Sequence, residues 1–421
     1  MTAPSRRPRA LATLALAAAL TLGSPATSPA QTTGSDGKPI TNAAGVTFGV
    51  LSHRGGALEA PENSVAAYTR SVAAGFDSIE TDIVFTRDGH GVMSHYDALP
   101  DRCTSPGTGI HTMTLAQVAL VRCADLAGDL VVPIPTFEQL AEALAANLDV
   151  GLTLDIKSYE GQSARSKRSW AAKAMKLVRS HGLLPRTSVL TFNWADVLPT
   201  VRSYAPRAYV LALDHGTVDL GRVRLAAKLG ADGFGIKMKY TSTFLAGYVK
   251  RKGMDCVPWE VVGDEQRAFS IHYGGMLQLF STDTPTLTRS QLVAGDIDLN
   301  PVPRPATTTL ATPVTISSGT YRADQRHYSA VSTRAVPTAD LAMLRDVTLA
   351  VTVTGGTGRG TLSVGAYASP LSTSTTVALP KGTATLTVKA PLGTALKLRI
   401  YTTRTVKLTV KVVAYTRVRF D

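Results

Sequence analysis

Short apolar runs alternate with longer amphipathic segments between residues 46 and 290. The runs that read as β-strands are Val46–Ser52, Ser78–Val84, Val150–Ile156, Thr187–Thr191, Ala208–Leu213, Gly233–Ile236, Asp255–Val261 and Gln278–Thr282. Helical spacing of apolar residues marks Ser64–Ala74, Phe137–Ala146, Ser166–His181, Asp219–Leu229 and Thr243–Lys252 between them. Eight strands separated by helices predict an α/β protein with a parallel sheet. We expect a (β/α)8 TIM-like barrel over 46–295, with an open doubly wound sheet as the alternative.

The pattern changes after residue 295. Residues 296–313 are rich in Pro and Thr, so we expect a linker there. Beyond it, apolar and polar residues alternate with the period of a β-strand. The alternating segments are Val347–Thr354, Thr361–Ala366, Thr383–Lys389, Ala395–Tyr401 and Val406–Val413. They predict a small all-β, sandwich-like domain over 314–421.

Residues 1–30 have the layout of a secretory signal peptide. Three arginines at positions 6, 7 and 9 precede the apolar run Ala10–Leu22. Ser28-Pro29-Ala30 is a candidate cleavage site, with Ser24-Pro25-Ala26 as the alternative. The run is too short to cross a bilayer of about 30 Å as a helix, although an uncleaved anchor is the alternative. We therefore expect a secreted protein whose mature chain has no transmembrane segment. Residues 31–45 would form an N-terminal extension.

The three cysteines bear on this expectation, because disulfides persist in oxidising compartments outside the cell. Cys103 and Cys123 lie twenty positions apart. A disulfide between them would stabilise the fold by about 3 kcal/mol, whereas two buried free thiols are the alternative. Cys256 falls on an apolar run, and we expect it to be unpaired and packed in the core.

The net charge of +13 is unevenly distributed along the 421 residues. Residues 1–30 carry +3, residues 31–300 carry −1, and residues 301–421 carry +11. This distribution argues against specific nucleic-acid binding by the whole chain. The basic β domain would attract an anionic cell-envelope polymer or lipid, and a passive, solubilising spacer is the alternative.

Acidic residues recur on the predicted barrel strands, where catalytic groups sit at the C-terminal ends. Glu80 and Asp82 are two residues apart on the second strand and so share a face, as do Asp155 and Lys157 on the third. Three carboxylates at one barrel mouth are unfavourable unless a cation lies among them. An all-oxygen site suits Mg²⁺ or Ca²⁺.

Two histidines and two fixed cations accompany these carboxylates. His53 and Arg54 directly follow the first strand, and His95 follows Val92-Met93-Ser94. Two imidazoles that titrate near neutrality can accept the proton of a nucleophile and protonate the leaving oxygen of a phosphodiester. Arg54 and Lys157 supply the positive charge that a phosphate requires.

Several of these residues belong to short motifs in a fixed order. The motifs are His53-Arg54-Gly55, Pro61-Glu62-Asn63, Glu80-Thr81-Asp82, His95, Ile134-Pro135-Thr136-Phe137, Asp155-Ile156-Lys157, Val257-Pro258-Trp259-Glu260 and Ser281-Thr282-Asp283-Thr284-Pro285. In this order they resemble the glycerophosphodiester phosphodiesterase family across nearly all of 46–290.

The resemblance implies a barrel enzyme that uses one divalent metal, Ca²⁺ or Mg²⁺, to hydrolyse glycerophosphodiesters to glycerol 3-phosphate and an alcohol. Its implied residue roles are as follows: His53 and His95 as the acid/base pair, Glu80, Asp82 and Asp155 as metal ligands, Arg54 and Lys157 as phosphate ligands, Glu62 and Asn63 as near-site support, and Trp259 in the substrate pocket. A core aromatic is the alternative role for Trp259.

Three departures from the family pattern keep other interpretations open. Asp155 stands where the family usually has Glu, and it resembles the sphingomyelinase D-like phospholipases that share the barrel. The family's His-Asp pair is His95-Tyr96 here, and alternation turns the next acid, Asp97, to the other side of Tyr96. Glu260 replaces a usual Thr. The alternative functions are a phospholipase D-like lipid-cleaving enzyme and a catalytically silent envelope-binding protein.

Overall fold

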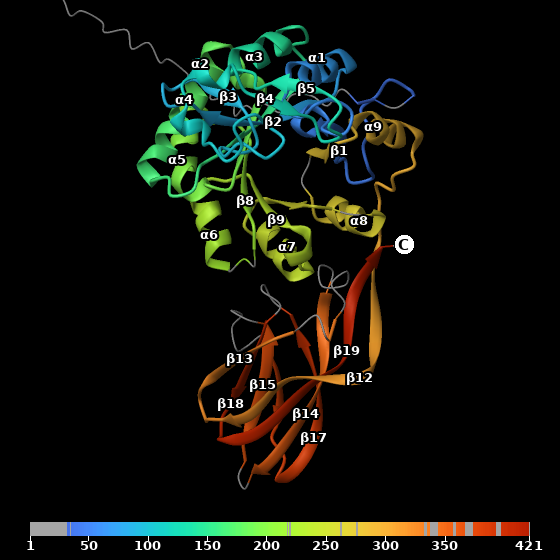
Figure 1. The fold of residues 1–421 in the computed structure, drawn as a ribbon. Coiled ribbons are helices and arrows are strands. Elements are labelled where there is room, and N and C mark those ends of the chain that lie inside the picture. Colours follow the sequence, from blue (N-terminus) through green and yellow to red (C-terminus); the bar gives the residue numbers. More distant parts are fainter. Residues whose placement is uncertain are drawn as a thin grey trace, which may run out of the picture.

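The chain forms an α/β barrel followed by a separate all-β domain (Figure 1). The computed structural model describes residues 32–33, 35–216, 218, 220–261, 263–274, 277–331, 335–336, 344–356, 359–366, 374–392 and 397–420. The signal peptide expected at 1–30 lies outside these residues. Within them, no helix is both apolar enough and long enough to span a membrane.

Within the described residues, eight parallel strands build the barrel, and each matches a strand expected from the sequence. They are β1 (Thr47–Ser52), β2 (Ser78–Phe85), β6 (Gly151–Ile156), β7 (Thr187–Thr191), β8 (Val210–Asp214), β9 (Gly233–Lys237), β10 (Asp255–Trp259) and β11 (Leu277–Thr282). Their order is β10-β9-β8-β7-β6-β2-β1-β11, in which the last strand of the chain lies beside the first. No pairing between β10 and β11 is found in the described residues. The arrangement confirms the TIM-like fold.

Helices cover the outer face of this sheet and bury its apolar side chains. They are α1 (Val65–Ala74), α3 (Phe137–Ala145), α4 (Ala164–Ser180), α5 (Trp194–Tyr204), α6 (Leu220–Lys228), α7 (Thr243–Arg251), α8 (Asp264–Tyr273) and α9 (Pro285–Ala294). Ser64 caps α1 by accepting from the Ala67 amide, and Thr136 and Gln139 form a capping box on α3. The ring of Phe85 on β2 lies 5.5 Å from that of Trp170 on α4. The main core therefore lies between strands and helices.

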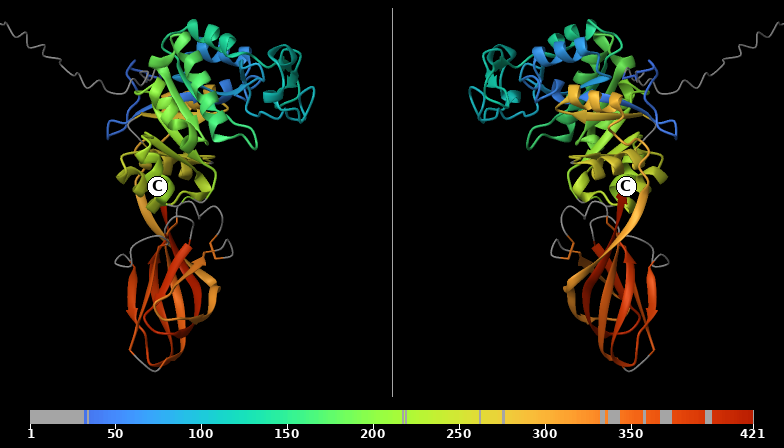
Figure 2. Two further views of the ribbon diagram at one scale, coloured as in Figure 1. Left: turned by 90° about the vertical axis from the view of Figure 1, so that its left-hand side faces the viewer. Right: turned by 90° about the vertical axis from the view of Figure 1, so that its right-hand side faces the viewer.

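An insertion between β2 and α3 projects from the side of the barrel (teal in Figure 2). It contains β3 (Gly91–Met93), which pairs with the end of β2, α2 (Leu115–Val118), and the hairpin of β4 (Arg122–Ala124) and β5 (Val131–Pro133). Cys103 and Cys123 form a disulfide within it, which confirms the expected pairing. Cys256 is buried and free, also as expected.

The C-terminal domain is a sandwich of two antiparallel sheets. One sheet contains β12 (Pro303–Tyr321), β19 (Val406–Phe420), β14 (Leu344–Gly356) and β17 (Gly382–Pro391); the other contains β13 (Arg326–Ala330), β18 (Lys397–Thr402), β15 (Thr361–Ala366) and β16 (Thr375–Ala378). On β19, Leu408 and Val410 are buried while Lys407 and Lys411 are exposed. This period-2 alternation produces the sandwich expected from the sequence.

The expected linker at 296–313 is wrong from residue 303 onward. Strand β12 begins at Pro303, which pairs with Phe420 of β19. The Pro-rich segment forms a strand because β12 is at the sheet edge, where prolines are tolerated, and threonines favour β-structure. The far end of β19 also contacts the barrel, since Arg417 donates to both carboxylate oxygens of Glu265 on α8 at 2.7 and 2.8 Å.

Candidate active site

The first functional segment is a tight turn directly after β1. His53, Arg54 and Gly55 form a short 3-10 turn in which Arg54 has φ 50° and Gly55 has φ 80°. A Cβ on Gly55 would lie 2.7 Å from the Ala67 Cβ, so only glycine fits. The turn places His53 and Arg54 at the C-terminal end of β1.

Three buried carboxylates meet on the next two strands. Asp82 of β2 lies directly opposite Asp155 of β6 in the parallel register, and Glu80 is on the same face of β2 as Asp82. One oxygen from each of the three residues lies within 4.8 Å of the others. The structure therefore brings together the three residues expected to bind metal.

The three carboxyl groups of this cluster differ in pKa because burial and neighbouring charges act on them to different degrees. Burial, followed by the charge of Asp82, raises the pKa of Glu80 to about 7. Burial also raises the pKa of Asp155 to about 6. Burial acts in the same direction on Asp82, but Lys157, His95 and Arg54 outweigh it and hold its pKa at about 2. Asp82 is therefore the most acidic member of the cluster.

Lys157 contributes the positive charge nearest to these carboxylates. Its Nζ donates to Asp82 Oδ1 at 2.8 Å and also forms an ion pair with Asp155 Oδ2. Burial acts to lower the pKa of Lys157, but the two carboxylates raise it above its ordinary value. Lys157 therefore lies within the carboxylate cluster, with its ammonium group paired to Asp82 and Asp155.

The carboxylate set fits a hard divalent cation. Asp155 Oδ1 is buried and has no hydrogen-bond partner in the described residues. A buried, unpartnered carboxylate oxygen is unfavourable, and a cation among the three acids would satisfy it. Oxygen donors of this kind suit Mg²⁺ or Ca²⁺.

His53 connects the cluster with the last barrel strand. Its Nδ1 donates to Asp283 Oδ1 at 2.6 Å, and its Nε2 lies 3.9 Å from Glu80 Oε2. Burial acts to lower the pKa of His53, but the hydrogen bond to Asp283 and the charge of Glu80 raise it overall. Asp283 follows β11 in one of the sequence motifs, although sequence reasoning gave it no role.

His95 follows β3 and has a different environment. Its Nδ1 is buried without a hydrogen-bond partner in the described part of the chain, and its ring meets Tyr96 edge-on at 4.3 Å. Burial lowers the pKa of His95 to about 3, well below the near-neutral value expected of both imidazoles from the sequence. Asp97 accepts a 2.6 Å hydrogen bond from Nδ1 of His111, as expected for an acid turned away from His95. A cleft beside His95 is also lined by His111 and Tyr159.

Glu62 and Asn63 support the site from the segment before α1. Arg54 donates from Nη1 to Glu62 Oε2 at 2.8 Å, and its backbone amide donates to Glu80 Oε2 at 3.0 Å. Asn63 donates from Nδ2 to Asp82 Oδ2 at 2.8 Å. Glu62 and Asn63 thus contact Arg54 and Asp82, respectively.

Trp259 lies half-buried at the end of β10, where a small aromatic cluster surrounds it. Its Nε1 donates to the Asp214 carbonyl at 3.1 Å, and the Lys237 ammonium lies 5.1 Å from its ring centre. The rings of Phe192 and His215 stack at 3.7 Å, and both lie edge-on to Trp259. Sequence reasoning missed Phe192, His215 and Lys237, although each ends or directly follows a strand of the structure: β7, β8 and β9, respectively.

Comparison with known proteins agrees with this geometry. A model of the glycerophosphoryl diester phosphodiesterase family matches residues 53–274, more than half of the chain. The matched segment begins at His53 and includes the carboxylates, both histidines and Trp259.

Named relatives and a solved structure extend the comparison. A glycerophosphodiester phosphodiesterase of Caldanaerobacter subterraneus is 27% identical over 221 residues, which is 50% of this chain and 85% of that protein. Human glycerophosphodiester phosphodiesterase 1 is 36% identical over 171 residues, covering 39% of this chain and 48% of the human protein. The crystal structure of a candidate phosphodiesterase from Silicibacter pomeroyi has the same fold, with a TM-score of 0.53 and 21% identity over 61% of this chain and 96% of its own. The chain belongs to the glycerophosphoryl diester phosphodiesterase family.

Proposed function

We propose that this protein is a metal-dependent phosphodiesterase that hydrolyses glycerophosphodiesters to glycerol 3-phosphate and an alcohol. One observation carries the proposal: an imidazole and a cluster of three buried carboxylates share the barrel mouth, with His53 Nε2 3.9 Å from Glu80 Oε2. Family membership and the name of the Caldanaerobacter relative support the choice of substrate class.

Glu80, Asp82 and Asp155 would hold the divalent ion, Mg²⁺ or Ca²⁺. When bound, it supplies positive charge that stabilises the negative phosphoryl oxygens. Arg54 and Lys157 add fixed positive charge beside it. The Nε of Arg54 is buried without a hydrogen bond in the described residues and lies 3.6 Å from Asp82 Oδ2, which holds the guanidinium beside the carboxylates.

The two histidines would move the protons. The hydrogen bond from His53 Nδ1 to Asp283 fixes the ring and leaves Nε2 on the side of the carboxylates. One imidazole accepts the proton of the nucleophile. Attack by water gives glycerol 3-phosphate directly, whereas attack by the substrate's own glycerol hydroxyl gives a cyclic phosphate that water then opens to glycerol 3-phosphate. The other donates a proton to the leaving alcohol oxygen as its bond to phosphorus breaks.

We also propose that the protein is secreted and that its basic C-terminal domain holds it to anionic envelope polymers or lipids. The signal-peptide pattern and the disulfide support secretion. Lys407 and Lys411 are exposed on the same face of β19 and support an electrostatic contact. Binding of the full chain to isolated envelopes should weaken with salt and with Lys407→Glu/Lys411→Glu. Binding unaffected by either would refute the electrostatic contact.

The proposed activity is tested by product analysis on the purified protein. Glycerophosphocholine and other glycerophosphodiesters should yield glycerol 3-phosphate; EDTA should abolish turnover, and Mg²⁺ or Ca²⁺ should restore it. Choline release from sphingomyelin or phosphate-ester cleavage of a lysophospholipid instead would favour the phospholipase D-like alternative, which Asp155 supports. No turnover of any diester with either ion would favour a catalytically silent binding protein.

A further inference from the structure

A chain of alternating charges runs from the inserted segment into the candidate active site. The guanidinium of Arg102 forms an ion pair with Glu62 Oε1. The other oxygen of Glu62 accepts a 2.8 Å hydrogen bond from Arg54 Nη1. Arg54 Nε in turn lies 3.6 Å from Asp82 Oδ2. Arg102 is therefore connected through one carboxylate to the residue proposed to bind phosphate.

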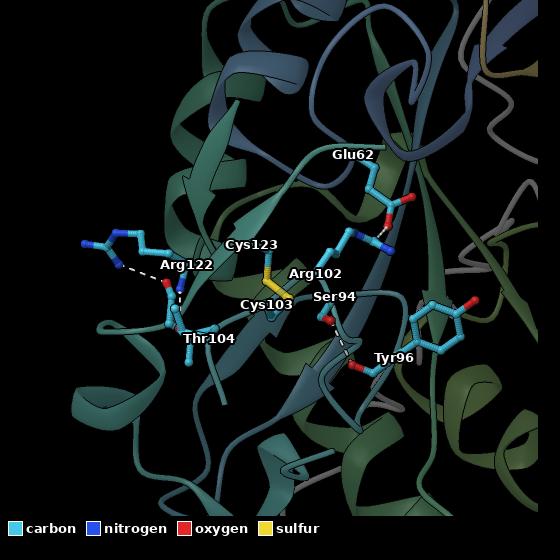
Figure 3. Close-up of a disulfide and its surroundings, with 9 residues drawn as sticks. Glu62, Ser94, Tyr96, Arg102, Cys103, Thr104, Arg122 and Cys123 are labelled. Atoms are coloured by element: carbon cyan, nitrogen blue, oxygen red, sulfur yellow. Dashed lines mark hydrogen bonds and ion pairs between the residues drawn. A yellow bond between two sulfur atoms is a disulfide. The ribbon is translucent and has the colours of Figure 1, made fainter. Parts of the chain in front are cut away.

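The disulfide fixes the backbone from which Arg102 extends. Arg102 directly precedes Cys103, and its carbonyl accepts a 2.9 Å hydrogen bond from the Ala124 amide, next to Cys123. In Figure 3 the Arg102 side chain points from the disulfide toward Glu62. A small cavity lined by Glu62, His95, Arg102 and both cysteines lies at this junction. The disulfide thus adjoins the wall of the site.

Glu62 shares its charge between two guanidinium groups. Its side chain is only 9% exposed, so water cannot readily replace a lost partner. Without Arg102, one buried oxygen of Glu62 would be unpaired, and its whole charge would act on Arg54. A carboxylate that has a single guanidinium partner favours a bidentate ion pair, in which both oxygens accept from that guanidinium. The bidentate ion pair would draw the Arg54 guanidinium toward Glu62 and away from a bound phosphate.

We propose that Arg102 is a positioning residue, held by the Cys103–Cys123 disulfide, that engages one oxygen of Glu62 and so keeps Arg54 directed at the substrate phosphate. The proposal rests on the proposed function, because Arg54 must bind the phosphodiester. It assigns the inserted segment a part in substrate binding, and it makes the disulfide a condition for full activity.

The test compares Arg102→Gln, Arg102→Lys and Arg122→Gln in the full-length oxidised protein. Arg122 is a matched control, because it adjoins the other cysteine but its side chain, among the described residues, donates only to the carbonyls of Ala119 and Val121. Arg102→Gln should lower kcat/KM for glycerophosphocholine about tenfold, mainly through a higher KM. Arg102→Lys should recover part of the loss, and Arg122→Gln should behave like the wild type.

A second arm tests the disulfide itself. Excess dithiothreitol reduces it by two electrons and two protons to two thiols, and the reagent becomes its cyclic disulfide. Reduced wild type, shown by circular dichroism to be folded, should lose about as much kcat/KM as oxidised Arg102→Gln. Reduction should lower Arg102→Gln little further, because both changes remove the same contact.

Two results, each with an active wild type, would overturn the inference while leaving the proposed function intact. In the first, Arg102→Gln and Arg122→Gln have the same kcat/KM. In the second, the losses of kcat/KM from reduction and from Arg102→Gln multiply when the two changes are combined. If reduction unfolds the protein, the comparison of the arginine variants decides alone. An inactive wild type with both ions supplied would instead refute the proposed function on which the inference rests.

Discussion

His53 donates a 2.6 Å hydrogen bond from Nδ1 to Asp283 Oδ1, although 230 positions separate the two residues. The barrel explains the contact, because β1 and β11 pair in parallel with Ser52 opposite Thr282. The residues that follow each strand therefore emerge side by side. This closure at the mouth orients an imidazole of the candidate site.

Replacing Asp283 by Asn should change both the rate and its pH dependence. The Asp283 contact raises the pKa of His53, so its loss should lower that pKa. The limb of the pH–rate profile that reports His53 should then move to lower pH, whether His53 acts as acid or base. We expect kcat/KM to fall roughly tenfold to a hundredfold. Steady-state kinetics across pH 5 to 9 would measure both effects.

Asp298→Asn, at an exposed position after α9, is the matched control and should leave the profile unchanged. An Asp283→Asn enzyme with an unshifted profile would show that the hydrogen bond does not set the protonation of His53.

A divalent cation should stabilise the protein more at pH 8 than at pH 5. The folded-state pKa values of about 7 for Glu80 and about 6 for Asp155 exceed their ordinary values. Without metal, these groups favour the folded state at low pH and lose that contribution as pH rises through 6 to 7. The cation needs the deprotonated carboxylates, so its affinity should rise over the same window. Tm with EDTA and with Mg²⁺ or Ca²⁺ would measure the effect.

Glu80→Gln should abolish both the cation-induced rise in Tm and the dependence of that rise on pH. A cation effect of equal size at pH 5 and pH 8, or one retained by Glu80→Gln, would place the ion elsewhere.

Trp259→Leu should raise KM by roughly tenfold and change kcat little, because the indole lies half-buried among the aromatic residues at the barrel mouth. Trp170→Leu, on the outer helix α4, should lower Tm without changing KM. If Trp259→Leu instead lowered Tm with an unchanged KM, the residue would be a core aromatic.

Loss of the disulfide should also cost stability. Cys103→Ser/Cys123→Ser opens a loop with a sequence separation of 20. The free energy of unfolding should fall by about 3 kcal/mol, measured by urea denaturation under oxidising conditions. Cys256→Ser removes a buried free thiol. Reducing agent should lower the free energy of unfolding of this variant no more than it lowers that of the wild type. A double variant as stable as the wild type would show that the insertion gains no stability from the bond.

Local patterns predicted the elements well because strands and helices follow the periodicity of apolar residues. Glu80 and Asp82 could be placed on one face from their spacing alone. The partners contributed by distant segments could not be predicted this way. Asp283 meets His53 only through the β1–β11 pairing, and Arg102 reaches Glu62 from an insertion whose path depends on a disulfide. The prediction of a linker was wrong for residues 303–313, because pairing with β19 overrides the local Pro-rich composition.

The most direct test of the account is the release of glycerol 3-phosphate from glycerophosphocholine by folded His53→Ala and His95→Ala proteins. With metal supplied, the account predicts an active wild type and a loss of about 10² to 10⁴-fold in kcat for each variant. Full activity in either variant would contradict the assignment of the two imidazoles to proton transfer.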